Sequence, residues 1–167
     1  MSAVISTCGT YRQRLDRVVD SMFGGPVYAF FGINGSTAGP VENDHTVTKL
    51  IGFTSRAGGS RFIIGNPLDL RTKDVRELAR HPAPVSPDNE LYLREIIAEA
   101  DILVPCWGNT RKVPQRLRHH VTALLDLIFA AGKPVKVFGF TKGGDPLHPL
   151  MLGYDTPLVD WRREIIR

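Results

Sequence analysis

The sequence predicts an α/β fold, a three-layer α/β/α sandwich around a central four-stranded, mainly parallel sheet. Four short apolar runs are each bounded by glycine, proline or polar turn residues, as expected of strands covered on both faces. Segments with apolar residues at helical spacing alternate with these runs, an order typical of parallel βαβ units with right-handed crossovers. At 167 residues, the chain is expected to form one domain over 1–167.

The individual elements follow from apolar spacing and from residues that start or stop secondary structure. Tyr11 and Leu15 belong to an apolar face at helical spacing, and the Gly-Gly-Pro at 24–26 is expected to end that helix. Thr72 and Ser86 are expected to cap two later helices, the second with proline at its first position. In chain order, the predicted elements are a helix over 11–23, a strand over 27–33, a helix over 46–56, a strand over 61–65, helices over 72–80 and 86–101, a strand over 101–108, a helix over 113–128, a strand over 134–140 and a last helical turn over 158–167.

Composition and charge favour a reduced, cytoplasmic protein with a mild preference for anionic partners. The apolar fraction of 43% and charged fraction of 23% are ordinary for a globular protein. No apolar run reaches the roughly 18 residues needed to cross a bilayer, and the chain start lacks a signal pattern, so no membrane partner is expected. Cys8 and Cys106 have no paired spacing for zinc or a redox motif. The net charge of +4 includes a basic stretch over 111–120, which is either a solvated helix face or a nucleic-acid contact.

Polar, glycine-rich and proline-rich segments follow all four predicted strands. In open α/β sheets, ligands bind beyond the carboxyl ends of the strands. The segments at those ends are GINGST, GNPLDLRT, CWGNTRK and FTKGGDPLHP. We therefore expect a single site at this edge of the sheet.

One histidine and two asparagines are the strongest candidates for chemistry at this edge. His148 lies between two prolines, and an imidazole can exchange a proton or stabilise an anion near neutral pH. Asn34 follows the first strand, and Asn66 offers a donor and an acceptor that suit the edge of a nucleobase. Each has a structural alternative, since asparagine is common in turns and most histidines are structural or merely exposed.

Further candidates flank these three residues. Asp44, His45 and Asp145 are titratable groups in the same loops, and Asp44 and Asp145 join Asn34 and His148 as candidate catalytic residues. Cations in these loops are expected to contact phosphate, although each is equally well explained as an exposed side chain. The glycines let a ligand approach the backbone and expose amides to an anion. The predicted phosphate-binding set is Ser36, Arg71, Arg111, Lys112, Lys142, Gly143 and Gly144.

Several functional classes lack their motifs in this chain. There is no G-x-x-x-x-G-K-[ST], no G-x-G-x-x-G and no H-E-x-x-H, which disfavours a P-loop, a standard dinucleotide site and a zincin. The absence of G-x-S-x-G disfavours an α/β-hydrolase. No convincing set of metal ligands stands out, so neither a metal nor another cofactor is predicted.

Longer motifs give the chain two resemblances. In order and spacing, YRQRLDR, GINGSTAG with ENDHTV, NPLDLRTKD, PDNELYL, CWG and GFTKGGDPLHPL resemble a bacterial and phage domain family of uncharacterised function. More distantly, GINGS, GNPLDLRT, ILVPCWG and LHPL resemble motifs of the uracil-DNA glycosylase superfamily, especially its mismatch-specific thymine/uracil branch. This second resemblance implies a uracil-DNA-glycosylase-like fold, with a four-stranded parallel sheet between helices.

The glycosylase resemblance also implies residue roles. Asn34 would position the attacking water, and His148 would stabilise the departing base anion. Asn66 would recognise a flipped base, with Ile33 and Gly35 beside it in the base-binding set. The chain departs from that branch at Gly35, where the branch has proline, and LHPL lacks a serine found in many relatives.

Three functional hypotheses follow. The first is a DNA glycosylase-like hydrolase that flips and excises a damaged or modified base, in DNA repair or phage defence. The second is a non-catalytic nucleic-acid-binding protein on the same scaffold, and DNA is the partner in both. The third is an enzyme that acts on free nucleotides or nucleosides.

Overall fold

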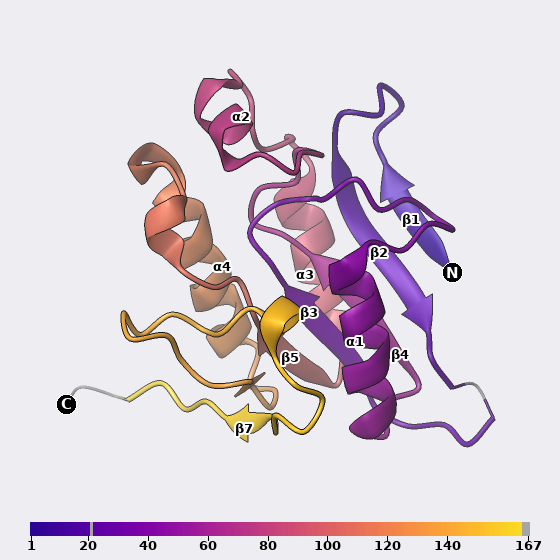
Figure 1. Ribbon diagram of the computed structural model, residues 1–167. Coiled ribbons are helices and arrows are strands. Elements are labelled where there is room, and N and C mark those ends of the chain that lie inside the picture. The colour runs from indigo at the N-terminus through magenta and orange to yellow at the C-terminus, as the bar shows by residue number, and fades with distance from the viewer. Residues whose placement is uncertain (21, 165–167) are drawn as a thin grey trace.

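The computed structural model describes residues 1–20 and 22–164, which form both strands and helices (Figure 1). Within these ranges, no helix has both the length and the apolar character needed to cross a bilayer. The elements are β1 (Ser2–Ile5), β2 (Arg12–Val18), β3 (Val27–Phe31), α1 (His45–Arg56), β4 (Arg61–Gly65), α2 (Val75–Arg80), α3 (Asn89–Glu99), β5 (Ile102–Pro105), the 3₁₀ turns η1 (Thr110–Lys112) and η2 (Gln115–Leu117), α4 (Arg118–Ala130), β6 (Lys136–Val137), the 3₁₀ turn η3 (Pro149–Met151) and β7 (Val159–Asp160).

A five-stranded mixed sheet forms the centre of the fold, in the order β1-β2-β4-β3-β5. Strand β3 pairs in parallel with β4 on one side and β5 on the other. Strand β2 pairs antiparallel with both β1 and β4. The predicted α/β class is confirmed, but the prediction of a four-stranded, mainly parallel sheet is wrong, because β1 and β2 extend the sheet in the antiparallel direction.

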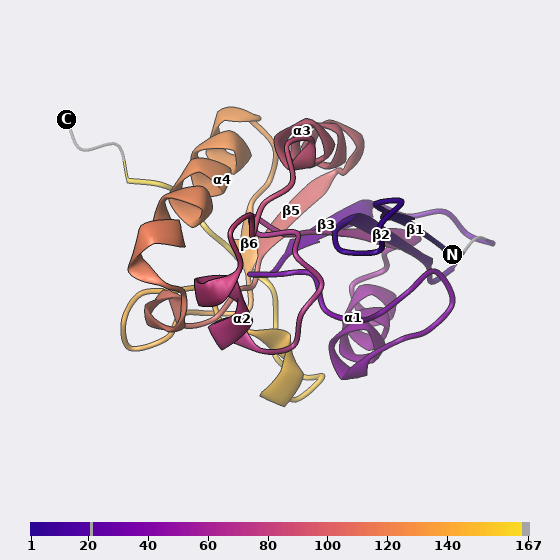
Figure 2. The ribbon, with the colours of Figure 1, turned by 90° about the horizontal axis from the view of Figure 1, so that it is seen from above.

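Helices lie on both faces of this sheet (Figure 2). On one face, α3 and α4 bury Ile96 and Leu124 together with Phe31 of β3. On the opposite face, α1 buries Leu50 against Phe30 of β3. Because alternate side chains of one strand point to opposite faces, β3 contributes to both apolar cores.

The helix predicted over 11–23 is wrong, because this range contains β2 in its described part. The inward positions of β2 carry Gln13, Leu15 and Arg17, each at most 5% exposed. Two of these three inward residues are polar, so the apolar residues do not alternate with polar ones as they do in a typical half-buried strand. The apolar residues of the range 11–23 fall at helical spacing instead, which led to the wrong prediction of a helix.

The end of the chain also differs from expectation. Within the strand predicted over 134–140, Val135 forms a parallel bridge with Leu103 of the main sheet. Beyond it, β6 pairs antiparallel with β7 in a separate two-stranded sheet. The helical turn predicted over 158–167 is wrong in its described part, where β7 stands instead, and residues 165–167 lie outside the described residues.

The remaining predicted helices form, with shifted starts. Asp74, not Thr72, caps α2, because its carboxylate accepts the N–H of Arg76 at 2.8 Å. The helix predicted from residue 86 begins three residues later, and the Ser86 N–H donates to buried Asp69 at 2.8 Å. Two 3₁₀ turns precede α4, which begins at Arg118.

The two cysteines lie in opposite environments, which gives a first testable prediction. Cys8 is exposed, and hydrogen bonds from Ser6 and Thr10 lower its pKa to about 7. Cys106 is buried, and this desolvation raises its pKa to about 12. Because the thiolate is the nucleophile, iodoacetamide near neutral pH should alkylate Cys8 and spare Cys106 in the folded protein.

Peptide mass spectrometry after timed labelling measures both sites at once. Ser6→Ala should raise the Cys8 pKa and slow its alkylation. Equal labelling rates at the two cysteines in the folded protein would contradict this prediction.

Candidate active site at the switch point of the sheet

The connections that follow β3 and β5 diverge from one point at the edge of the sheet. After β3 the chain passes through α1 to β4 on one side, and after β5 it passes through α4 to Val135 on the other. The Cys106 N–H donates to the Phe31 carbonyl at 2.9 Å, so these two strand ends lie side by side. Such a topological switch point is where open α/β sheets bind ligands.

Asn34 stands three residues beyond β3 and is partly buried. Its Nδ2 donates to the Thr72 carbonyl at 2.5 Å, and its backbone forms a parallel bridge with Leu68. Among the described residues, no donor reaches its Oδ1. The side chain is therefore anchored through its amide nitrogen while its oxygen stays available as an acceptor, for example to a water molecule.

His148 reaches the same edge from the β5 side. It lies just before η3, and its Nδ1 accepts the Leu150 N–H at 3.2 Å, which places the proton of the neutral ring on Nε2. A Cβ at Gly108, which follows β5, would lie 3.3 Å from the His148 Cβ. Gly108 also has a φ of +74°, which favours glycine, so its small size and its conformation both serve this approach.

The surroundings of His148 favour its neutral form. Desolvation lowers its pKa most, although part of the side chain is exposed to solvent. Asp44 opposes this shift and Lys112 adds to it, so both charges lie within electrostatic reach of the ring. At neutral pH, His148 therefore presents a neutral imidazole with an N–H donor at Nε2.

Asp44 is held by two hydrogen bonds at the start of α1. Its Oδ1 accepts the Val47 N–H at 2.8 Å and caps the helix, and its Oδ2 accepts the Ser36 hydroxyl. Ser36 also accepts from Arg12, at 3.4 Å. Asp44 and Ser36 thus have structural roles, and their predicted catalytic and phosphate contacts stay predictions. His45 is the exposed first residue of α1.

Two buried arginines of β2 hold the loop between Ser36 and Asp44. Arg12 is 2% exposed and donates to the Ala38 carbonyl at 3.0 Å, and burial lowers its pKa to about 10. Arg17 is 1% exposed, and burial lowers its pKa too. The Arg17 guanidinium donates to Asn43 Oδ1 at 2.7 Å and to the carbonyls of Gly39 at 2.7 Å and Glu42 at 3.1 Å.

Neither Arg12 nor Arg17 was predicted to be buried or to hold a loop. No local pattern marked their burial, because their acceptors lie in the loop over 38–43, which the tertiary structure brings beside β2.

The predicted base-binding residues lie deeper than Asn34 and His148. Asn66 is 3% exposed, and its Nδ2 has no partner among the described residues. Its Oδ1 lies 2.9 Å from the place that a Cβ on Gly32 would take, against the backbone at the switch point. Ile33 packs against apolar residues, and a Cβ on Gly35 would approach the Asp69 carbonyl at 3.1 Å. Of these three residues, Asn66 is the one whose side chain keeps a polar group without a partner, its Nδ2. Contact of Asn66, Ile33 and Gly35 with a base stays a prediction.

Exposed cations border the β5 side of the site. Asp145 connects the turn over 141–146 with η1, because its carboxylate accepts the Thr110 N–H at 3.1 Å and hydroxyl at 2.8 Å. This use of Asp145 is structural, and a catalytic role for it stays a prediction. The connection draws together most of the predicted phosphate-binding set, namely the exposed residues Arg111, Lys112, Lys142, Gly143 and Gly144.

Two hollows of the surface lie elsewhere. One of about 390 Å³ lies beside Arg71, and another of about 630 Å³ lies beside Lys133 near the end of the chain. Neither is lined by Asn34 or His148. Over residues 1–20 and 22–164, no three His, Cys, Asp or Glu side chains gather as a metal-binding group.

The chain matches one known protein family. Residues 12–150 match the family described as Protein of unknown function (DUF1643). This range contains Asn34, Asn66 and His148. No curated protein and no solved structure matches the chain, so the resemblance to uracil-DNA glycosylases gains no support from these comparisons.

Proposed function

Since the chain belongs to the DUF1643 family, whose function is unknown, we propose an activity from its site: hydrolysis of the N-glycosidic bond of a base in DNA. One observation carries this proposal. Asn34 and His148 are anchored at the neighbouring ends of β3 and β5, on the two sides of the switch point.

Base excision needs one group that orients the attacking water and one group that stabilises the departing base. Water attacks the anomeric carbon, the C–N bond breaks with its electron pair going to the base, and positive charge develops on the sugar. The Oδ1 of Asn34 would orient the water, and Nε2–H of His148 would donate to the departing base anion. Fixed donors and acceptors of this kind are effective because they need no reorganisation during the reaction.

The surface beside His148 suits a duplex substrate. Arg111, Lys112 and Lys142 are exposed and can contact phosphates, which contributes sequence-independent affinity. Met151 follows His148 by three residues and is 90% exposed. Apolar side chains at such positions can enter a base step and help to unstack it, which lowers the cost of flipping a nucleotide.

A panel of DNA duplexes tests the proposal. Each duplex carries one candidate base, such as uracil, mismatched thymine or a modified pyrimidine, and alkaline cleavage reveals abasic product. We expect product from at least one duplex with the wild-type protein. The absence of abasic product across the panel would contradict the proposal.

The lowered pKa of His148 predicts the pH dependence of excision. Protonation of Nδ1 would break its hydrogen bond with the Leu150 N–H and disturb the η3 cap. The rate should therefore be constant near neutral pH and fall as pH decreases through a value below the ordinary histidine pKa of about 6.5. Single-turnover rates across pH 4.5–8 measure this profile, and an acid limb centred above pH 7 would contradict it.

A binding role is the second candidate, and the acidic residues of the site favour it. Asp44 and Asp145 both accept hydrogen bonds that stabilise loops, so each carboxylate has a structural role that a non-catalytic protein would also need. A non-catalytic protein would bind DNA with a steep dependence on salt, and His148→Ala would leave that binding intact. Binding that ignores salt would exclude this alternative.

A further inference from the structure

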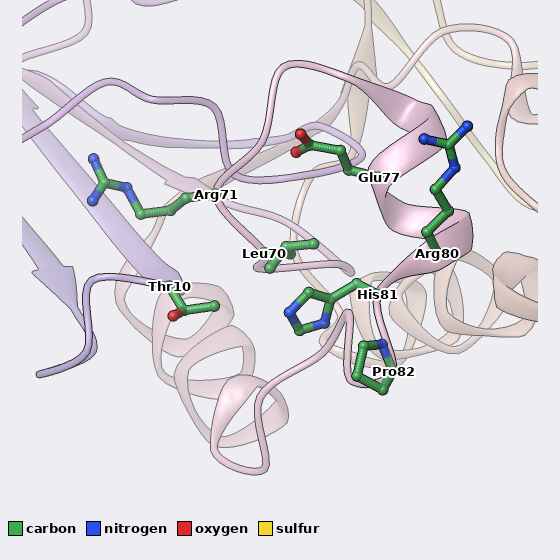
Figure 3. A pocket seen from close by; sticks show the side chains of 7 residues that line it. All are labelled: Thr10, Leu70, Arg71, Glu77, Arg80, His81 and Pro82. Carbon is green, nitrogen blue, oxygen red and sulfur yellow. The ribbon is translucent and has the colours of Figure 1, made fainter.

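The hollow of about 390 Å³ lies between the β1–β2 turn, the segment after β4 and the end of α2 (Figure 3). Its volume falls within the range typical of small-molecule sites. Leu70 and Pro82 supply apolar surface, and the other side chains are polar or charged. The lining residues are Thr10, Leu70, Arg71, Glu77, Arg80, His81 and Pro82.

His81 is held in a defined orientation at this hollow. Its Nδ1 accepts the Ala83 N–H at 3.0 Å, so the neutral ring carries its proton on Nε2. The Tyr11 ring meets it edge-on with centroids 6.4 Å apart, and the Tyr11 hydroxyl donates to the Ala83 carbonyl at 2.7 Å. In Figure 3 the imidazole lies between Thr10 and Pro82, below Leu70. A donor that is already oriented loses little conformational entropy when a ligand binds.

The charged residues around the hollow favour an anion that also carries donors. Arg71 donates to the carbonyls of Gly9 at 3.1 Å and Thr37 at 3.2 Å, while its buried Nε–H has no acceptor among the described residues. Arg80 is exposed and forms no hydrogen bond or ion pair with the described part of the chain. Glu77 accepts from the Thr72 hydroxyl and adds one negative charge.

We propose that this hollow binds a nucleotide. The planar base would pack on Leu70 and Pro82 within reach of His81, and the phosphate would pair with Arg80 at the rim. Arginine suits phosphate through its planar set of donors, and Glu77 can accept from a ring amine or a sugar hydroxyl. The site is distinct from Asn34 and His148, so nucleotide binding here does not depend on base excision.

Titration calorimetry of the full chain tests the proposal with AMP, GMP, CMP and UMP, the matching nucleosides, and a short single-stranded oligodeoxynucleotide. Arg80→Ala should weaken binding of the preferred nucleotide by about tenfold or more, because a charge-assisted hydrogen bond is lost. Arg76→Ala is the matched control: Arg76 lies on the same helix, its side chain is 83% exposed, and it is outside the hollow. The affinity of the Arg76→Ala protein for the same nucleotide should differ from that of the wild type by less than about twofold.

The outcomes separate the possible sources of the nucleotide. Mononucleotide binding that Arg80→Ala weakens identifies a free nucleotide as a ligand. Binding of the oligodeoxynucleotide alone, with the same loss in Arg80→Ala, identifies a nucleotide within a strand. Failure of every probe to bind at millimolar concentration, or equal affinities of Arg80→Ala and Arg76→Ala, would overturn the proposal.

Discussion

Replacing Arg17 with alanine is expected to lower the free energy of unfolding by about 3–5 kcal/mol. The guanidinium is almost fully buried and is the donor for Asn43 Oδ1 and for the carbonyls of Gly39 and Glu42. Truncation removes these donors together and leaves a cavity. A loss of this size is a large part of the roughly 5–15 kcal/mol that stabilises a domain.

Urea unfolding of both proteins measures the difference. The midpoint should decrease while the dependence of the unfolding free energy on urea stays the same. Arg94→Ala is the control, because this arginine is 58% exposed and pairs with Glu90 on the surface of α3, where the expected loss is at most about 0.5 kcal/mol. An Arg17→Ala protein within about 1 kcal/mol of the wild type would show that β2 does not hold the loop as described.

Alanine at either Asn34 or His148 is expected to lower the single-turnover rate of base excision by about 10²–10³-fold. Each change removes a group that acts on charge developing in the transition state, one on the water and one on the base. DNA affinity should change little, because the phosphate contacts come from exposed cations.

His45→Ala is the matched control for His148→Ala. His45 is also an exposed imidazole, but it is the first residue of α1 and has no assigned part in the reaction. Its rate should stay within about twofold of the wild type. Excision that survives both Asn34→Ala and His148→Ala would exclude these residues from the chemistry.

The buried parallel strands could be predicted from the sequence because their positions are apolar on both faces of the sheet, except for Arg61 at the start of β4. Strands β3, β4 and β5 are continuous apolar runs, and their paired ends brought the expected loops to one edge. Strand β2 could not be recognised in this way, because Arg17 faces inward with its charge satisfied by a loop far along the chain. Contacts of that kind depend on tertiary structure and leave no local pattern.

The same limit applies to the site. Strand order predicted that Asn34 and His148 share one edge of the sheet. Asn34 lies just beyond β3 and His148 approaches Gly108 after β5, while their catalytic roles stay predictions. The hydrogen-bond partners of Asp44 and Asp145 could not be predicted from the sequence. Asp44 is a helix cap bound to Ser36, and Asp145 bonds to Thr110 thirty-five residues away. Spacing alone did not distinguish these structural carboxylates from catalytic ones.

The most direct test is a crystal structure of the protein with duplex DNA that contains a tetrahydrofuran abasic-site analogue. We expect the flipped sugar to lie at the switch point, with Asn34 on one side and the His148 ring on the other. A complex in which the sugar binds away from the ends of β3 and β5, or in which the DNA leaves both side chains uncontacted, would contradict it.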